Sequence, residues 1–238
     1  MLEKGHTYSM KNIPIKNKEV LAALKDFEWY YDNKDWLKEH LRVSGSASDR
    51  EYFVSETHRD EIIKQDHAHE GYPDTAHFIS LKNDRLDIQQ SGVYSTAKHS
   101  SGVVDIYKKF GELNTNLCTL LSTRNNALCS LYPPNGFISW HNNANASAYN
   151  LIFTWSETGE GCFKYVDGHT GKTIVMQDEK GWQCKAGYFG AYHEPWYNRV
   201  YHAAETDCWR MTISYIFDRT DMSMGLQDEI IEEIMSDY

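Results

Sequence analysis

The chain lacks the patterns that define several large classes of protein. Its five cysteines are widely spaced and form no CxxC pair, which excludes a disulfide framework and a structural zinc knot and favours reduced thiols. No stretch reaches the roughly 18 consecutive apolar residues of a membrane span, and the first residues lack the apolar segment of a secretory signal. We therefore expect a soluble, intracellular protein of the cytoplasm.

Positive charge is also scarce. Lys and Arg number 24 against 34 Asp and Glu, which gives a formal net charge of −10. Because phosphate binding draws on clustered basic side chains, this balance argues against a nucleic-acid or anionic-membrane partner. It is compatible with a local basic pocket and with a small-molecule or peptide substrate. The sequence does not indicate an oligomeric state.

Length and composition are sufficient for a large core. The 238 residues are 41% hydrophobic and 13% aromatic, and β barrels or sandwiches of about 200–250 residues often form one undivided domain. We expect a single domain over residues 1–238. Its expected parts are N-terminal helices and substrate-side loops over 1–125, a catalytic core over 126–218 and a C-terminal helix over 219–238.

Helical periodicity is found in three segments. Apolar residues recur every three to four positions over residues 18–31 and 103–121, although Gly111 weakens the middle of the second helix. Leu226, Ile230 and Ile234 stand among acidic residues and predict a C-terminal helix. Residues 45–102 are mostly polar, with scattered aromatic residues and short apolar alternations. This composition predicts short strands and long loops.

After residue 126 the pattern changes to short apolar runs broken by turn residues. These runs predict strands over residues 127–132, 136–140, 149–155, 161–166, 172–176, 185–192, 199–201 and 209–217. So many short strands in this length predict a mainly β fold with flanking helices, built on a double-stranded β-helix (jelly-roll) core.

Two of the eleven histidines stand out by position. His141 ends an aromatic-rich run in which Phe137 and Trp140 are expected to form a dry wall beside it. His202 comes shortly before the last strand, so both imidazoles are expected near one mouth of the barrel. Neutral imidazoles suit Fe, Zn, Cu or Ni about equally. The pattern therefore predicts a metal site without choosing the metal.

An arginine at the start of the last strand suggests an anion beside that metal. Period-two alternation places Arg210, Thr212, Ser214 and Ile216 on one face of the strand, which is therefore mainly polar. A buried guanidinium must be paired, and no carboxylate alternates beside Arg210. The expected partner is a ligand carboxylate, held bidentately with help from the Thr212 hydroxyl. The alternative is a structural ion pair with Glu157, Glu194 or Asp207.

These motifs together resemble the 2-oxoglutarate and Fe(II)-dependent dioxygenase superfamily, particularly its prolyl-hydroxylase-like branch, over about residues 126–218. Residues 131–141 look like that family's tyrosine, glycine turn and first iron-binding histidine. Residues 159–163 resemble its glycine-rich turn, and residues 185–189 the segment before its second ligand. The distal histidine and the Arg-x-Ser/Thr carboxylate clamp are matched by His202, Arg210 and Thr212. The order and spacing make the signal fairly specific.

The resemblance implies an enzyme that hydroxylates a peptide side chain or small metabolite while decarboxylating 2-oxoglutarate to succinate and CO2. Its cofactors would be Fe(II), 2-oxoglutarate and O2, with ascorbate as an optional reductant. Residues 45–102 would select the substrate. The implied metal residues are His141, Asn143 and His202, and the implied co-substrate residues are Arg210, Thr212 and Tyr132. Tyr132 has the alternative interpretation of a rim or core tyrosine.

Position 143 departs from the family pattern, because members of the family carry Asp or Glu there. Asn143 could coordinate through its amide oxygen or hold a coordinating water, which would leave a weaker hydroxylase. The position could instead admit a halide, as in the halogenating branch, although that branch has smaller residues there. A non-catalytic jelly-roll binding module and a zinc or copper cupin-type enzyme also stay open. Three further candidates fit the motif less well: Asn145 and Glu157 as ligands, and His193 in place of His202.

Overall fold

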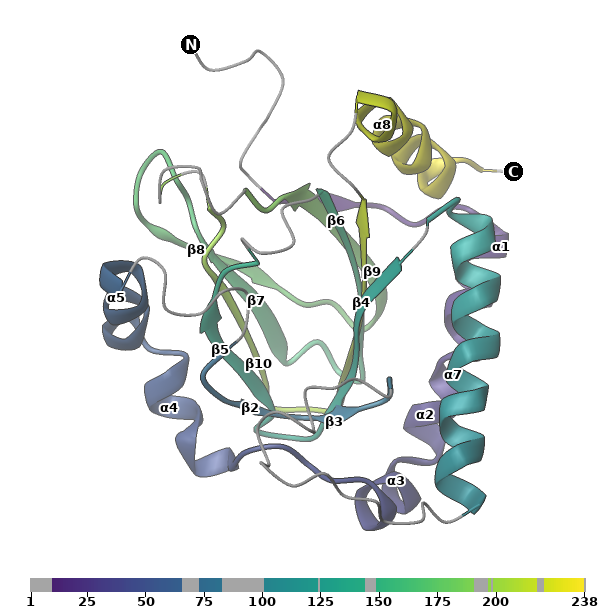
Figure 1. Ribbon diagram of the computed structural model, residues 1–238, viewed down its shortest axis with the longest axis horizontal. Helices are drawn as coiled ribbons and strands as arrows, with labels where there is room; N and C mark the ends of the chain where they lie inside the picture. Colours follow the sequence, from purple (N-terminus) through teal and green to yellow (C-terminus); the bar gives the residue numbers. More distant parts are fainter. Residues whose placement is uncertain are drawn as a thin grey trace.

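The computed structural model describes residues 10–65, 73–82, 101–123, 125–143, 149–190, 197, 199–217 and 221–237. Within these ranges two antiparallel sheets face each other (Figure 1). The first contains, in spatial order, β1 (Lys11–Ile13), β9 (Gly181–Tyr188), β6 (Tyr149–Ser156), β11 (Arg210–Phe217), β4 (Asn125–Tyr132) and β3 (Ile79–Ser80). The second contains β2 (Ala76–His77), β5 (Phe137–His141), β10 (His202–Thr206), β7 (Gly161–Val166) and β8 (Thr173–Gln177).

This strand order confirms the predicted mainly β fold with flanking helices on a jelly-roll core, because most consecutive strands from β4 to β11 alternate between two facing sheets, and strands distant in sequence, such as β4 and β11, pair within a sheet. Seven of the eight predicted strands are present. The segment 199–201 is not a strand: the amide of Tyr201 donates to the carbonyl of Arg199 in a tight turn, and the strand begins at His202. The assignment of the whole chain to one domain stays a prediction.

The periodic helices cover the outside of the six-stranded sheet (Figure 1). The single helix predicted over residues 18–31 is divided at Phe27 into α1 (Lys18–Asp26) and α2 (Glu28–Asp32), and α3 (Lys34–His40), which was not predicted, follows it. The periodic segment 103–121 forms the long α7 (Ser101–Leu120). The side chain of Asn17 caps α1 by accepting from the amides of Glu19 and Val20. Leu24 and Leu117 pack with Ile213 in one apolar cluster between the helices and the sheet. The C-terminal helix α8 (Asp221–Met235) adds Ile230 and Ile234 to it.

The prediction of strands and loops over residues 45–102 is wrong for its first part. Residues 47–65 form η1 (Ala47–Asp49), α4 (Arg50–Phe53) and α5 (Glu56–Gln65), which lie outside the five-stranded sheet (Figure 1). Only two residues of α5 are buried, His58 and Ile62, one helical turn apart. So narrow a stripe is hard to recognise in a polar sequence. Residues 66–72 and 83–100 lie outside the described ranges. None of the helices in the described part of the chain is long and apolar enough to cross a membrane.

Candidate functional site

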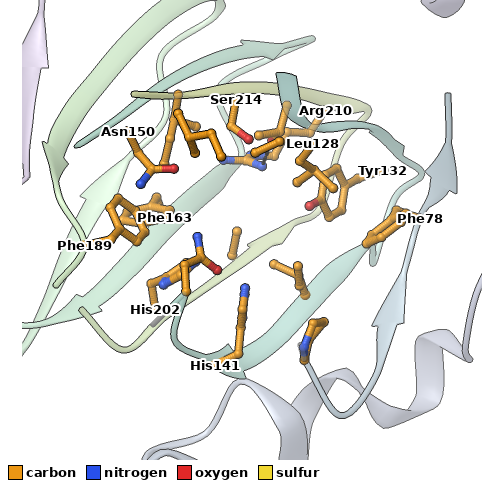
Figure 2. Close-up of a pocket in the computed structure, with 18 residues that line it drawn as sticks. Phe78, Leu128, Tyr132, His141, Asn150, Phe163, Phe189, His202, Arg210 and Ser214 are labelled. Atoms are coloured by element: carbon orange, nitrogen blue, oxygen red, sulfur yellow. Dashed lines mark hydrogen bonds between the residues drawn. The ribbon is translucent and has the colours of Figure 1, made fainter. Parts of the chain in front are cut away.

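A pocket of about 220 Å³ lies between the two sheets (Figure 2). Its walls include buried apolar side chains such as Ile138, Phe163 and Phe189. The histidines enter from the five-stranded sheet, and the polar face of β11 opposes them. All six site residues predicted from the sequence line this pocket: His141, Asn143, His202, Arg210, Thr212 and Tyr132.

The alternation predicted for β11 is confirmed. Arg210, Thr212, Ser214 and Ile216 line the pocket, and the intervening residues Met211, Ile213, Tyr215 and Phe217 belong to the apolar cluster under the helices. One strand thus forms a pocket wall on one face and a core wall on the other, as the period of two requires.

A β-bulge in β5 directs His141 into the pocket. Strand β10 pairs His202 with His141 and Ala204 with Ile138, so three steps along β5 oppose two along β10. Ile138 and His141 therefore face the same side, although a regular strand would place them on opposite faces. Trp140 turns outward and packs against Ile62 of α5.

The bulge also corrects one expectation. Phe137 and Trp140 were expected to form a wall beside His141, but neither is among the described residues that line the pocket. Phe137 precedes the inward-facing Ile138 and so falls on the other face of β5, and the bulge carries Trp140 to that face as well. The dry wall is supplied instead by Phe163 on β7 and by Phe189.

Backbone carbonyls fix the protonation pattern of both imidazoles. Nδ1 of His141 lies 2.8 Å from the carbonyl oxygen of Ser139, and Nδ1 of His202 lies 2.9 Å from that of Val200. A carbonyl only accepts, so each Nδ1 carries the proton and each Nε2 keeps a lone pair. The ring centroids are 4.1 Å apart. Burial and the neighbouring His141 lower the pKa of His202 well below its ordinary value, so that ring is neutral at neutral pH.

These donors fit a divalent transition metal, but with a weak third partner. Two neutral imidazoles with oriented Nε2 atoms are typical metal ligands. The third side chain that could contribute a donor is the half-buried Asn143, which offers an amide oxygen. The described residues contain no group of three or more His, Cys, Asp or Glu that could hold a metal ion. The donor set is therefore neutral, and we expect it to bind Fe(II) less tightly than a set with a carboxylate.

The other ligand candidates do not join the pocket in the described structure. Glu157 accepts hydrogen bonds from the hydroxyl of Tyr31 and the amide of Trp209, and it is not among the described residues that line the pocket. Asn145 and His193 lie outside the described residues, so those two alternatives stay untested.

Arg210 is already paired within the protein. Its Nε donates to Oδ2 of Asp178 at 2.7 Å, and the two side chains are 1% and 0% exposed. Nη1 donates to the Thr212 hydroxyl at 2.6 Å and Nη2 to the Thr154 hydroxyl at 3.4 Å. The expected partner was a ligand carboxylate, but the chain itself supplies one from Asp178, an acid that was not among the predicted alternatives.

None of the three acids proposed as structural partners takes this role among the described contacts. Glu157 bonds as described above, Asp207 pairs with Arg50, and Glu194 lies outside the described residues. Asp178 was missed because it follows the end of β8 in the other sheet, where no alternation pattern links it to Arg210.

Asp178 serves a second buried cation. Its Oδ1 accepts from Nζ of Lys185 at 3.0 Å, and both side chains are fully buried. Nζ of Lys185 also donates to Oε1 of Gln183 at 2.8 Å. Burial would raise the pKa of Asp178, but Arg210 and Lys185 outweigh it and lower that pKa overall. Burial lowers the pKa of Lys185, against the attraction of Asp178.

Gly161 leaves the room that this carboxylate needs. A Cβ at that position would lie 2.8 Å from Oδ2 of Asp178 and 3.0 Å from the hydroxyl oxygen of Thr206. The glycine-rich turn seen in the sequence therefore has a packing reason. Together with a lysine inside the strand β9, it is the signal that could have pointed to the buried charges.

Tyr132 stands beside the guanidinium. It is the cross-strand partner of Arg210 in the β4–β11 ladder, and the guanidinium carbon lies 5.4 Å from its ring centroid. Burial raises the pKa of Tyr132 to about 12, although Arg210 and a hydrogen bond with Thr212 act in the opposite direction. The phenol thus stays protonated at neutral pH and remains a hydroxyl donor. Its ring also packs against Phe78, with centroids 5.3 Å apart. The position is therefore compatible with a co-substrate-binding hydroxyl and with a core tyrosine.

Comparison of the sequence with protein-family models and with curated proteins gives no match. Among solved structures, a prolyl-4-hydroxylase of Pseudomonas putida has a TM-score of 0.39 at 12% identity and covers 90% of this chain and 95% of its own. The viral collagen prolyl hydroxylase of Paramecium bursaria Chlorella virus-1, in complex with 2OG, has a TM-score of 0.32 at 10% identity and covers 72% of this chain and 90% of its own. A rice dioxygenase for auxin oxidation has a TM-score of 0.25 at 14% identity and covers 83% of this chain and 67% of its own. All three TM-scores are below 0.5.

Proposed function

We propose that the protein is a non-haem, 2-oxoglutarate-dependent oxygenase that hydroxylates a peptide side chain or a small metabolite. His141, His202 and Asn143 would hold Fe(II), and Arg210, Thr212 and Tyr132 would bind the distal carboxylate of 2-oxoglutarate. The observation that carries the proposal is the convergence, in one pocket of about 220 Å³, of two imidazoles with oriented lone pairs and a buried guanidinium. Bound iron would supply the O2 activation that couples 2-oxoglutarate decarboxylation to C–H hydroxylation.

The pairing of Arg210 with Asp178 is compatible with a carboxylate clamp. A guanidinium has five N–H groups, and the hydrogen bonds to Asp178, Thr212 and Thr154 use one each on Nε, Nη1 and Nη2. One N–H on each Nη is left without an acceptor among these contacts. Those two groups suit bidentate binding of a ligand carboxylate. Asp178 would then act as a positioning residue that fixes the guanidinium plane.

Residues before the barrel reach the pocket, as expected for a substrate-selecting region. Pro73 and Phe78 both line it, and Phe78 contacts Tyr132. The buried apolar walls formed by Phe163 and Phe189 would limit the access of bulk water to the reacting groups.

The proposal is tested by co-substrate binding in the Arg210→Ala variant. Under anaerobic conditions, the native protein with Fe(II) and 2-oxoglutarate should show a weak visible charge-transfer band, and the variant should lose it through weaker 2-oxoglutarate binding. The variant leaves Asp178 paired with Lys185, so no buried carboxylate is orphaned. The matched control is Arg42→Ala, at an exposed arginine. Undiminished 2-oxoglutarate binding by Arg210→Ala would contradict the assignment.

The neutral third donor and the internal ion pair favour one second candidate. A jelly-roll module could retain the pocket as a dicarboxylate-binding site without turnover. Stoichiometric 2-oxoglutarate binding with no succinate release, under Fe(II), ascorbate and O2 and across a panel of peptide and small-molecule substrates, would select this candidate over the oxygenase.

A further inference from the structure

The strand β8 lies at one edge of the five-stranded sheet. It pairs with β7 on one side, and no strand of the described ranges pairs with its other side. Such edges invite pairing with another chain, and natural proteins often protect them with charged side chains, proline or a bulge. Residues 173–177 contain no charged residue and no proline, and their register with β7 runs without a shift. The edge of β8 therefore has none of these three protections.

The hydrogen bonds at the two ends of the β7–β8 ladder show which backbone groups of β8 point outward. The amide of Asp178 donates to the carbonyl of Gly161, and the amide of Asp167 donates to the carbonyl of Lys172. Along an antiparallel strand, residues alternate between those that exchange hydrogen bonds with the neighbouring strand and those that do not. The even-numbered residues of β8 therefore bond to β7. The amides and carbonyls of the odd-numbered residues point to the free edge: Thr173, Val175 and Gln177.

Apolar side chains are exposed on both faces of this edge. Val175 is 53% exposed and Ile174 is 38% exposed, and adjacent residues of a strand point to opposite faces of the sheet. Both residues are β-branched, a type that is enriched in strands. A partner that adds one strand to the edge would cover both side chains, whereas a partner that packs on one face would leave the other exposed. The edge therefore fits an extended strand.

We infer that β8 is a self-association surface, on which a second copy of this chain pairs its own β8 in antiparallel orientation about a two-fold axis at Val175. In this register the two Val175 residues lie opposite each other, and Ile174 lies opposite Met176 of the second copy. Thr173 lies opposite Gln177. Each apolar residue thus meets an apolar residue, and each polar residue meets an uncharged polar one.

The backbone of β8 fits the same register. Its outward-pointing residues stand at the two ends and at the centre of a strand of five residues. A two-fold axis at the central residue therefore pairs each of them with another outward-pointing residue, and each such pair exchanges two hydrogen bonds. This register is also the one in which all five residues have an opposite residue. A two-fold dimer needs a self-complementary patch, and the edge of β8 meets that requirement in its backbone and in its side chains.

Sedimentation equilibrium tests the association. One pair of short strands is small beside a standard interface of about 1,600 Å², so we expect a reversible dimer whose population rises over roughly 1–500 μM protein. Val175→Pro removes an amide that points away from β7 and so spares the β7–β8 ladder. It should weaken the dimer by roughly tenfold or more through lost inter-strand hydrogen bonds. Val175→Thr keeps that amide and a β-branched side chain, and it should still dimerise. A native chain that stays monomeric over this range, or undiminished association of Val175→Pro, would overturn the inference.

Oxidative cross-linking of Val175→Cys tests the register itself. The Cα atoms of opposite residues in a hydrogen-bonded pair are about 5.5 Å apart, which is within the range of a disulfide, so this variant should form a covalent dimer. Gln177→Cys is the matched control, because it is exposed on the same face of β8 but lies four steps, about 14 Å along the strand, from its copy. The native chain controls for the five existing cysteines. Equal cross-linking of the two variants, or none of Val175→Cys, would rule out the two-fold pairing.

Discussion

Buried charge is the feature of the site that depends most on single residues. Asp178 accepts from both Arg210 and Lys185, and Gly161 leaves space for its carboxylate. The sequence alone predicted Arg210, because alternation along one strand is a local pattern. It could not predict Asp178, because the contact joins the end of β8 to the facing sheet. Asn143, in contrast, was identified by its departure from a motif.

Replacing Asp178 by Asn should strongly destabilise the fold. The amide leaves two buried cations without a carboxylate, and breaking a buried ion pair costs about 3–5 kcal/mol. Urea unfolding at neutral pH measures the loss. The control is Asp207→Asn, at the exposed partner of Arg50, which should cost less than about 1 kcal/mol. An equal loss of unfolding free energy in the two variants would show that the buried ion pairs of Asp178 stabilise the fold no more than an exposed ion pair does.

The same carboxylate predicts an acid-sensitive contribution to stability. The pKa of Asp178 is lower in the folded protein than its ordinary value, so the contribution is fully present above an unfolded-state pKa of about 3.9 and is lost as the pH falls through the folded pKa. Other acids with lowered pKa values, such as Glu205, also contribute in this range. The difference in unfolding free energy between native and Asp178→Asn chains isolates Asp178 and should shrink below about pH 4. A constant difference would refute the linkage.

At the scale of elements, agreement with the sequence follows the length and regularity of each pattern. The long periodic segment around residues 103–121 forms α7, and the alternating run from Arg210 forms β11. The short α5 was missed because only His58 and Ile62 mark its buried face. The bulge in β5 is a property of strand pairing, so no pattern within β5 could reveal it.

Two glycines in different elements should respond oppositely to alanine. A Cβ on Gly111 of α7 meets nothing within 4 Å, so Gly111→Ala should stabilise the protein by about 0.5–1 kcal/mol through the cost of glycine in a helix. A Cβ on Gly161 would press on Asp178, and overpacking of this kind costs about 1–3 kcal/mol. Thermal unfolding of both variants tests the pair. Stabilisation by Gly161→Ala would show that the Asp178 carboxylate can move at little cost.

At the scale of the whole molecule, a positive pocket lies inside an acidic protein. The formal net charge is −10, while Arg210 is the one Lys, Arg, Asp or Glu side chain among the described residues that line the pocket. Long-range fields act before short-range contacts and are screened by salt over about 10 Å at 0.1 M. The net negative charge therefore repels an approaching diacid at long range, and Arg210 attracts it at short range.

This contrast predicts an unusual salt dependence. If the net charge dominates the approach, the association rate of 2-oxoglutarate with the protein loaded with Mn(II), a redox-stable substitute for Fe(II), should rise as sodium chloride is increased from about 20 to 200 mM, because screening weakens the overall repulsion. Stopped-flow tryptophan fluorescence measures the rate. A rate that falls with salt would mean that Arg210 steers the diacid despite the acidic surface.

The bulge in β5 makes the position of His141 depend on strand pairing as much as on residue type. A slip of β5 by one residue against β10 would exchange the faces of its side chains, bringing Trp140 toward the cavity and turning the imidazole toward α5. A related barrel with unbulged β5 pairing would therefore not reproduce this arrangement by a histidine substitution alone. It would also need an inserted residue, so in this fold a gain or loss of one codon could switch the two-histidine arrangement on or off.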